Sequence, residues 1–285
     1  MFFASDNGAP VHPAIMDALL AANAGSAMAY GNDALTGRAI EALRAAFEAP
    51  RAGVFLLTSG TAANALALAT LAQPYQTIYT TPDAHVMRDE CNAPEFFTGG
   101  AKLLPVGAEA GKMRPEALAR ALDPARFHSE HDGMPGAVSL TNLTERGTLY
   151  TPDEIAALAR IAHGAGVPVH LDGARLANAL AASGASLAEM TWKAGVDAVS
   201  LGATKNGALA AEAVVLFDPG HAGALAFRRM RGGHLLSKHR YLSAQMLAWL
   251  DGGLWLDLAR DANARTATLA RGLRAIDGVE ITAEP

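Results

Sequence analysis

The sequence contains one cysteine, Cys91, among 285 residues. A single thiol cannot form an intramolecular disulfide bond, and such low cysteine usage is typical of proteins in reducing compartments. The amino terminus has no basic region followed by a long apolar core, so no signal peptide is predicted. These absences favour a cytoplasmic protein.

The sequence also lacks an excess of basic residues and long hydrophobic runs. Lys and Arg number 23 against 28 Asp and Glu, which gives a net charge of −5. This balance argues against a nucleic-acid partner or an anionic membrane. No apolar run reaches the about 20 residues of a transmembrane helix. The hydrophobic content of 51% can instead build a sizeable core, in one large domain or in a large and a small one.

Short apolar runs alternate with helical patterns from residue 54 onward. We predict strands at residues 54–58, 77–80, 102–106, 137–141, 168–172, 197–201 and 213–217. Strands that alternate with helices indicate a mostly parallel sheet with helices on its faces. The last two strands are joined by residues 202–212 alone, which is short for a parallel crossover. The seventh strand is therefore predicted to be antiparallel.

Two helices, at residues 237–250 and 254–276, follow the sheet, and a strand is predicted to begin at 278–281. We therefore expect residues 1–240 to form an N-terminal arm and a large domain. Residues 241–285 are expected to start a small, incomplete C-terminal domain.

Lys205 follows the sixth strand, in the turn Gly202-Ala203-Thr204-Lys205-Asn206-Gly207. Burying an ammonium group is costly, but a desolvated amine is suited to forming a Schiff base. On this stretch alone, a loop lysine that points into water is the alternative.

A candidate phosphate site follows the first strand. Ser59-Gly60-Thr61 opens a helix, and its backbone N–H groups and hydroxyls could hold a phosphate at the positive end of the helix dipole. The same three residues would also make an ordinary capping turn.

Two charged residues mark the end of the fifth strand. Asp172 could pair with a protonated ring nitrogen or cap the following helix, and Arg175 could bind a carboxylate or form an ion pair with Asp172 or another acid. Ligands of α/β sheets bind beyond the carboxyl ends of the strands, where all these groups fall. Phosphate cradle, acid, arginine and lysine together indicate pyridoxal phosphate (PLP) and an amino acid.

Motifs over nearly the whole chain carry a family resemblance. They are Ser5-Asp6-Asn7, Ala29-Tyr30-Gly31, Gly60-Thr61-Ala62-Ala63-Asn64, Ala84-His85, Asp89-Glu90-Cys91, Ala93-Pro94-Glu95-Phe96-Phe97, Ser139-Leu140-Thr141, Asp172-Gly173-Ala174-Arg175, Thr191-Trp192-Lys193-Ala194-Gly195-Val196-Asp197 and Gly202-Ala203-Thr204-Lys205-Asn206-Gly207. In these the chain resembles the threonine aldolase family of fold-type-I PLP enzymes. It is most similar to the bacterial branch of low-specificity L-threonine aldolases and phenylserine aldolases. Seven strands with one antiparallel edge also fit that fold.

The resemblance implies a set of cofactor ligands. By it, Lys205 forms the Schiff base with PLP and Asp172 holds the pyridine nitrogen. Gly60, Thr61 and Thr204 hold the phosphate, beside Ser59 of the predicted cradle. No metal ligands are assigned.

The resemblance also implies substrate contacts. Ser5 and Arg175 take the substrate carboxylate, and His85 stacks on the cofactor ring and handles the proton of the substrate hydroxyl. His128 matches a second histidine near the β-hydroxyl. The alternative for His128 is a surface histidine in a variable loop.

Two further residues resemble those that a neighbouring subunit lends to the site. They are Tyr30 and Arg229, the latter near the phosphate. Which of Arg228, Arg229 and Arg231 reaches inward is open, and a solvated basic turn is the alternative. A homodimer or homotetramer is therefore expected.

The chain departs from the family at its end. The family's C-terminal domain continues past the position of Pro285 and carries a further carboxylate-binding arginine. Against the family's length we expect either a truncated or a naturally short chain, and the resemblance implies weaker carboxylate binding and activity in the second case.

The predicted activity is cleavage of an L-β-hydroxy-α-amino acid, such as L-threonine, L-allo-threonine or phenylserine, to glycine and an aldehyde. Elimination, transamination or racemisation on the same fold is the nearest alternative. The second alternative is a non-catalytic binding protein of this fold.

Overall fold

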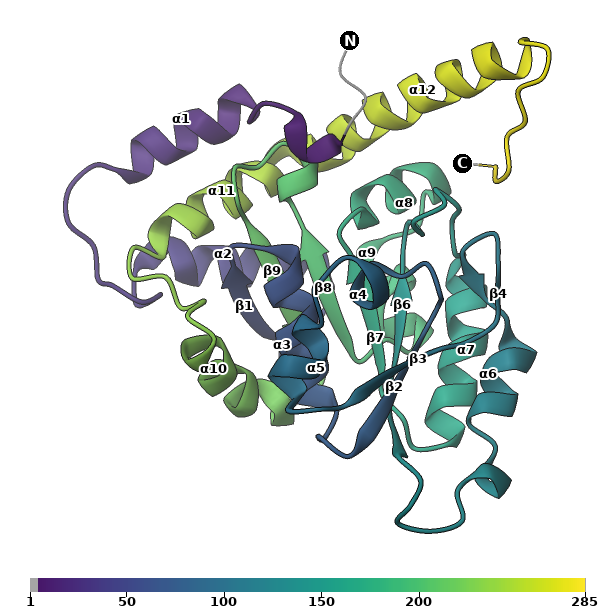
Figure 1. Ribbon diagram of the computed structural model, residues 1–285. Helices are drawn as coiled ribbons and strands as arrows, with labels where there is room; N and C mark the ends of the chain where they lie inside the picture. Colours follow the sequence, from purple (N-terminus) through teal and green to yellow (C-terminus); the bar gives the residue numbers. More distant parts are fainter. Residues whose placement is uncertain (1–4, 285) are drawn as a thin grey trace.

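The computed structural model describes residues 5–284, and a seven-stranded sheet forms its centre (Figure 1). The strand order is β1-β9-β8-β7-β6-β2-β3, and β4 and β5 form a separate hairpin. The strands are β1 (Gly53–Leu57), β2 (Gln76–Thr80), β3 (Lys102–Pro105), β4 (Ala108–Glu109), β5 (Lys112–Met113), β6 (Met134–Thr141), β7 (Val169–Gly173), β8 (Ala198–Gly202) and β9 (Glu212–Leu216). All seven predicted strands are confirmed within three residues at each end, whereas the β4–β5 hairpin was not predicted.

Strand β9 is antiparallel to both of its neighbours, and the other adjacent pairs are parallel. The predicted antiparallel seventh strand is thus confirmed, but its place at the edge of the sheet was wrong. Strand β1 pairs with the outer side of β9 and satisfies the backbone groups that an edge strand would leave free. As a result Leu57 and Gly202, at the ends of β1 and β8, both lie opposite Glu212.

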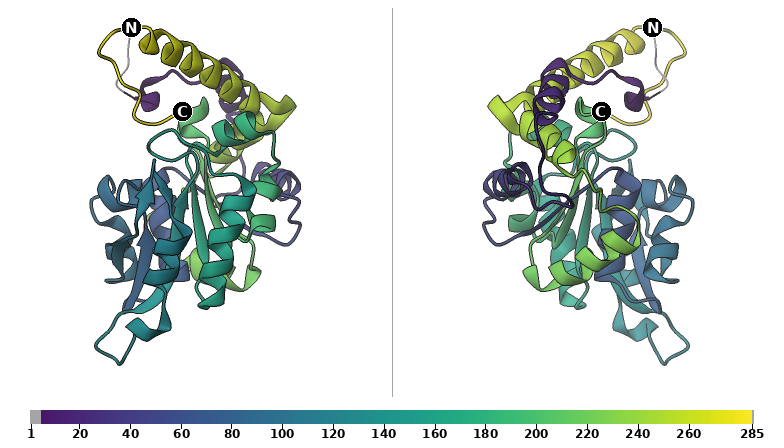
Figure 2. Two further views of the ribbon diagram at one scale, coloured as in Figure 1. Left: turned by 90° about the vertical axis from the view of Figure 1, so that its right-hand side faces the viewer. Right: turned by 90° about the vertical axis from the view of Figure 1, so that its left-hand side faces the viewer.

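Helices cover both faces of the sheet (Figure 2). Helices α3 and α10 pack on one face, while α2, α7, α8, α9 and α11 contribute to the larger core on the other. The helices are α1 (Pro13–Ala22), α2 (Ala34–Ala46), α3 (Gly60–Leu71), α4 (His85–Arg88), α5 (Ala93–Thr98), α6 (Pro115–Ala121), α7 (Pro152–Gly164), α8 (Leu176–Ser183), α9 (Leu187–Met190), α10 (Ala222–Arg231), α11 (Arg240–Leu250) and α12 (Leu254–Arg274). Among the described residues, no helix is long and apolar enough to cross a membrane.

Along the central strands, alternate apolar side chains point to opposite faces of the sheet and so contribute to both hydrophobic cores. On β8, Ala198 packs with α3, while Val199 and Leu201 pack in the larger core on the opposite face. Successive residues of a strand point to opposite faces, and a sheet covered on both sides needs apolar residues at each position. The short apolar run that ends in Gly202 therefore forms a strand buried at all five positions.

The C-terminal segment differs from the prediction. Helices α11 and α12 confirm the two predicted helices, and α11 packs against α1 and α2. The predicted strand at 278–281 is wrong, because these residues are irregular and no strand of the described chain lies beside them to supply hydrogen bonds. The domain boundary at residue 240 stays a prediction.

Candidate active site

The candidate phosphate cradle lies where β1 ends and α3 begins. Ser59 caps α3, and its hydroxyl accepts the Ala62 N–H at 3.3 Å. The first N–H groups of a helix have no partner within it, so those of Gly60 and Thr61 remain available to an anion. A Cβ added at Gly60 would meet no atom within 4 Å, which leaves open space in front of the cradle.

Thr204 adjoins this cradle because β1 and β8 both end beside β9. Its hydroxyl accepts the Ala211 N–H at 3.2 Å. Glu212 is buried and hydrogen-bonded to Thr204, and burial raises the pKa of the Glu212 carboxyl to about 7. The close approach here requires Gly202, since a Cβ would lie 2.9 Å from Glu212 Oε2. This carboxyl thus fixes the turn that carries Lys205.

Asp172, the last residue but one of β7, is a buried carboxylate with defined partners. Its Oδ1 accepts the Ala174 N–H at 3.0 Å, and its Oδ2 accepts from Asn64 Nδ2 at 2.8 Å. A carboxylate has about four acceptor sites, so two remain for a protonated ring nitrogen.

Asn64 connects Asp172 to a second carboxyl. Its Nδ2 also donates to Glu90 Oε1 at 2.9 Å, and Glu90 Oε1 lies 2.8 Å from His85 Nδ1. The hydrogen bond to Glu90 raises the pKa of His85, against the lowering effect of burial. With Glu90 as a carboxylate, which only accepts hydrogen bonds, Nδ1 carries the proton of this pair and Nε2 is the other ring nitrogen.

A cavity of about 400 Å³ brings four predicted residues together. They come from the N-terminal arm, the start of α4, the residue before α8 and the turn after β8: Ser5, His85, Arg175 and Lys205. The remaining lining residues are Asn7, Asp89, Leu143, Thr144, Glu145 and Gly147. Parallel strands place their following loops at one edge of the sheet, which is why distant segments meet here.

Arg175 already binds a carboxylate in this structure. Its Nε donates to Asp6 Oδ2 at 2.7 Å and its Nη2 donates to Asp6 Oδ1 at 3.1 Å. Of the partners proposed for Arg175, an acid other than Asp172 is therefore the one found. The geometry is the bidentate kind that planar guanidinium groups form with carboxylates.

Of the three arginines in the last turn of α10, Arg229 is the one that points to the sheet. Its Nη1 donates to Leu56 O at 3.3 Å, and its guanidinium lies 5.2 Å from the centre of the Phe55 ring. Its Nε is buried with no partner in the described chain, and burial lowers the pKa of Arg229. Arg228 and Arg231 instead line a surface cavity beside α5.

His128 and Tyr30 are two of the predicted residues that do not line the cavity; the others are Ser59, Gly60, Thr61, Asp172, Thr204 and Arg229. His128 is exposed in the loop before β6, at the opposite end of that strand from the site, and its N–H donates to Asp132 Oδ2 at 2.9 Å. Tyr30 is 52% exposed, and its N–H donates to Ser237 O at 2.9 Å. Roles for both at an active site stay predictions.

Asn64, Glu90 and Glu145 are among the polar residues of the site that were missed from sequence. Asn64 and Glu90 lie in motifs of the resemblance but had no role there, and Glu145 was not considered. A signal existed for Asn64, since a polar side chain in the otherwise apolar α3 needs a buried partner. Glu145 Oε1 accepts the His85 backbone N–H at 2.8 Å and so holds the start of α4.

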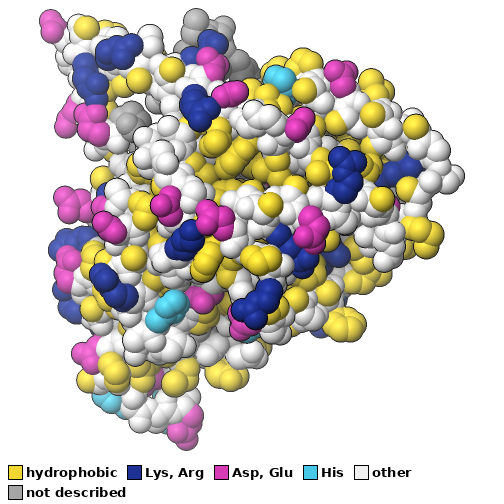
Figure 3. All heavy atoms as spheres, turned by 180° about the vertical axis from the view of Figure 1, so that it is seen from behind, with side chains coloured by type: hydrophobic (Ala, Val, Ile, Leu, Met, Phe, Trp, Pro, Cys, Tyr) yellow, Lys and Arg dark blue, Asp and Glu magenta, His cyan; other side chains and the backbone are white. Residues whose placement is uncertain are grey.

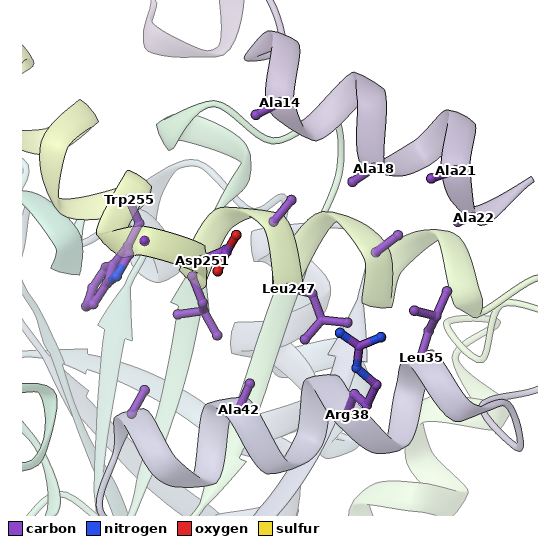
Figure 4. A pocket seen from close by; sticks show the side chains of 15 residues that line it. Ala14, Ala18, Ala21, Ala22, Leu35, Arg38, Ala42, Leu247, Asp251 and Trp255 are labelled. Atoms are coloured by element: carbon purple, nitrogen blue, oxygen red, sulfur yellow. The ribbon is translucent and has the colours of Figure 1, made fainter.

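A larger cavity, of about 800 Å³, lies elsewhere in the described chain (Figure 4). It lies between α1, α2 and α11 and is lined mainly by alanine and leucine, with Arg38 and Asp251 as its charged groups. Figure 3 shows hydrophobic side chains gathered in a hollow on the rear face of the molecule. The catalytic residue types gather instead in the smaller cavity described above.

Residues 3–284 match the family model of the beta-eliminating lyases. The chain belongs to the beta-eliminating lyase family. This lyase chain is 40% identical over 279 residues to the low specificity L-threonine aldolase of Pseudomonas sp. (strain NCIMB 10558), covering 98% of the chain and 80% of that relative. It is 41% identical over 280 residues to the enzyme of the same name from Pseudomonas aeruginosa, again covering 98% and 80%.

The fold of this chain is also similar to those of solved structures. This lyase chain superposes on the threonine aldolase of Leishmania major with a TM-score of 0.90 and 28% identity, covering 95% of this chain and 78% of that one. The aspartate aminotransferase of Thermus thermophilus, at 16% identity and a TM-score of 0.74, covering 95% and 71%, shares the fold. The predicted fold-type-I architecture is thus confirmed.

Beta-eliminating lyases and threonine aldolases depend on PLP, and the residues of this site fit that cofactor. A helix N-terminus with open space before Gly60 suits a phosphate, and Asp172 offers a buried carboxylate for the ring nitrogen. Lys205 follows β8, the strand that pairs with β7, and supplies the amine. The predicted cofactor is confirmed, whereas the individual residue roles stay proposals.

Proposed function

We propose that the protein cleaves L-threonine and related L-β-hydroxy-α-amino acids, such as L-allo-threonine and phenylserine, to glycine and an aldehyde. The observation that carries this proposal is the cavity that unites Lys205, His85 and Arg175. It occurs in a chain 40% identical to a low specificity L-threonine aldolase, which supports the same reaction here.

The chain offers groups for the aldehyde, the ring nitrogen and the phosphate of PLP. Lys205 is the covalent anchor, and Asp172 holds a proton on the ring nitrogen by its negative charge. Gly60, Thr61 and Thr204 hold the phosphate, with Ser59 fixing the helix start. When bound, PLP supplies an electron sink for the electron pair of the broken Cα–Cβ bond.

The substrate carboxylate is bound by Arg175 and Ser5. Both line the cavity, and Arg175 has donors left beyond the two that Asp6 uses. Fixing the carboxylate sets the direction of the Cα–Cβ bond, and such positioning lowers the entropic part of the barrier.

His85 removes the β-hydroxyl proton. Its Nδ1 is engaged by Glu90, so Nε2 accepts the proton as the hydroxyl oxygen becomes the aldehyde carbonyl. The Cα–Cβ bond breaks, the aldehyde leaves, and a proton added at Cα completes glycine. General base catalysis of this kind is worth roughly 10²–10⁴-fold.

We propose further that the protein acts in the cytoplasm as a homodimer or homotetramer with shared sites. The single cysteine supports a reducing compartment. Tyr30 and Arg229, which resemble residues lent to a neighbouring site, support the assembly.

Product analysis tests the proposed function. The protein loaded with PLP should convert L-threonine to glycine and acetaldehyde, and L-phenylserine to glycine and benzaldehyde. Release of ammonia and 2-oxobutanoate from L-threonine would mean β-elimination instead. Absence of turnover with bound PLP would favour a binding protein.

A further inference from the structure

The N-terminal arm crosses the site and is tied down on two sides. Asp6 pairs with Arg175 at the start of α8, 169 residues along the chain. His12 donates its N–H to Gly207 O at 2.9 Å, directly after the turn of Lys205. Ser5 and Asn7, on either side of Asp6 in the chain, line the cavity.

The pairing of Asp6 with Arg175 uses one edge of the guanidinium. Asp6 takes the edge formed by Nε and Nη2, and the described residues give the Arg175 guanidinium no other hydrogen-bond partner. A guanidinium has five N–H donors, so three remain, and two of them form the end edge of Nη1 and Nη2. That edge can bind a second carboxylate in the same bidentate manner.

We infer that Asp6 is a positioning residue, which holds Arg175 by its side edge and presents its end edge to the substrate carboxylate. The inference rests on the proposed function for the role of Arg175. An arginine side chain has many rotamers, and fixing it before the ligand arrives reduces the entropy that binding loses. The ion pair of Asp6 with Arg175 also holds Ser5 at the cavity, because Ser5 directly precedes Asp6. The Ser5 hydroxyl accepts the Asn7 N–H at 3.2 Å.

A competing interpretation makes the opposite prediction. If Asp6 occupied the place of the substrate carboxylate, the substrate would have to displace it. Removing the negative charge of Asp6 would then strengthen the binding of an amino acid. Long-range electrostatics also predicts stronger binding of the substrate carboxylate, because the loss of the Asp6 charge makes the cavity more positive.

The test compares glycine with methylamine, which lacks only the carboxylate. Dissociation constants are measured from the absorbance change of bound PLP, for wild type, Asp6→Asn and Asp6→Glu. Asp261→Asn, which breaks an exposed ion pair with Arg265 on α12, is the control for loss of one acidic charge. Retention of PLP and the midpoint of thermal unfolding report on folding.

We expect Asp6→Asn to weaken glycine binding about tenfold, the effect of about 1.4 kcal/mol. Methylamine binding should be unchanged, and Asp6→Glu should recover part of the loss. In turnover, KM for L-threonine should rise about tenfold while kcat stays within about twofold. Asp261→Asn should match wild type in all of these.

Equal or tighter glycine binding by Asp6→Asn would overturn the inference. Equal loss of glycine and methylamine binding would also overturn it, because the defect would then lie in the site as a whole. A wild type that holds PLP but does not bind glycine would overturn the proposed function, and this inference with it.

Discussion

His85 Nδ1 lies 2.8 Å from Glu90 Oε1, and the side chain of Glu90 is fully buried. The hydrogen bond and the charge of Glu90 raise the pKa of His85, and the charge of Asp172 acts in the same direction. Burial and the positive charge of Lys205 oppose them, but the net direction is upward. The proposed base therefore becomes neutral at a higher pH than an ordinary histidine.

This pairing predicts the pH dependence of cleavage. His85 accepts a proton only when Nε2 is unprotonated, so kcat/KM for L-threonine should rise with pH, with a midpoint above the about 6.5 of a free histidine. In Glu90→Gln the charge is lost and the midpoint should move to lower pH. A midpoint that is the same in both proteins would show that His85 is not the titrating base.

Replacing His85 by Phe separates its two expected roles. Phenylalanine keeps a flat ring over the cofactor but has no nitrogen to accept a proton. PLP should still bind, while cleavage of L-threonine falls by roughly 10²–10⁴-fold. Cleavage within a few fold of wild type would leave His85 as a platform alone and assign the proton to another group.

A buried histidine on β7 predicts how stability depends on pH. His170 is 0% exposed between the Ser139 and Ser200 hydroxyls, at 3.0 and 2.9 Å, and burial lowers its pKa to about 4. The unfolded chain takes up this proton near pH 6.5, while the folded chain does so near 4. The free energy of unfolding should therefore fall as the pH drops through this window, by about 3 kcal/mol from this residue.

Urea unfolding of wild type and His170→Gln, followed between pH 7 and pH 4, measures that contribution. Glutamine can still bond both serines but does not titrate. The variant should lose less stability on acidification, whatever its stability at pH 7. Parallel pH dependence in the two proteins would contradict a neutral buried His170. The pKa of His239 is also lowered to about 4, but this residue is present in both proteins, so its contribution to the pH dependence cancels in the comparison.

The proposed assembly predicts a mass of at least twice the 29.5 kDa of one chain. Light scattering on the active, PLP-loaded protein should give a dimer or tetramer, because Tyr30 and Arg229 are expected to complete a neighbour's site. An active monomer would refute the shared site.

The fold could largely be predicted because buried strands and amphipathic helices leave strong local patterns. Even the reversal of β9 followed from the short link after β8. Its place inside the sheet did not, because pairing with β1 depends on a contact far along the chain. The strand expected at 278–281 failed for a related reason, since a strand forms only where another strand pairs with it.

The site residues that could be predicted are those whose side-chain type by itself indicates a chemical role. Lys205, Asp172 and Arg175 stand at strand ends, and the fold brings them to one edge. The side chains that orient them were not predictable, because the bonds of Asn64 to Glu90 and Asp172 span 26 and 108 residues. The partner of Arg175 was not predictable either, since Asp6 begins a three-residue 3-10 helix, which is too short to leave a periodic pattern in the sequence.

The most direct test of the account is the identity of the lysine that carries the cofactor. The PLP-loaded protein is reduced with borohydride, digested and mapped by mass spectrometry, with Lys205→Ala as the control. We predict a pyridoxyl group on Lys205 and none in the variant. Modification of Lys193 or Lys238 instead, or no modification at saturating PLP, would contradict the assignment of this cavity as the active site.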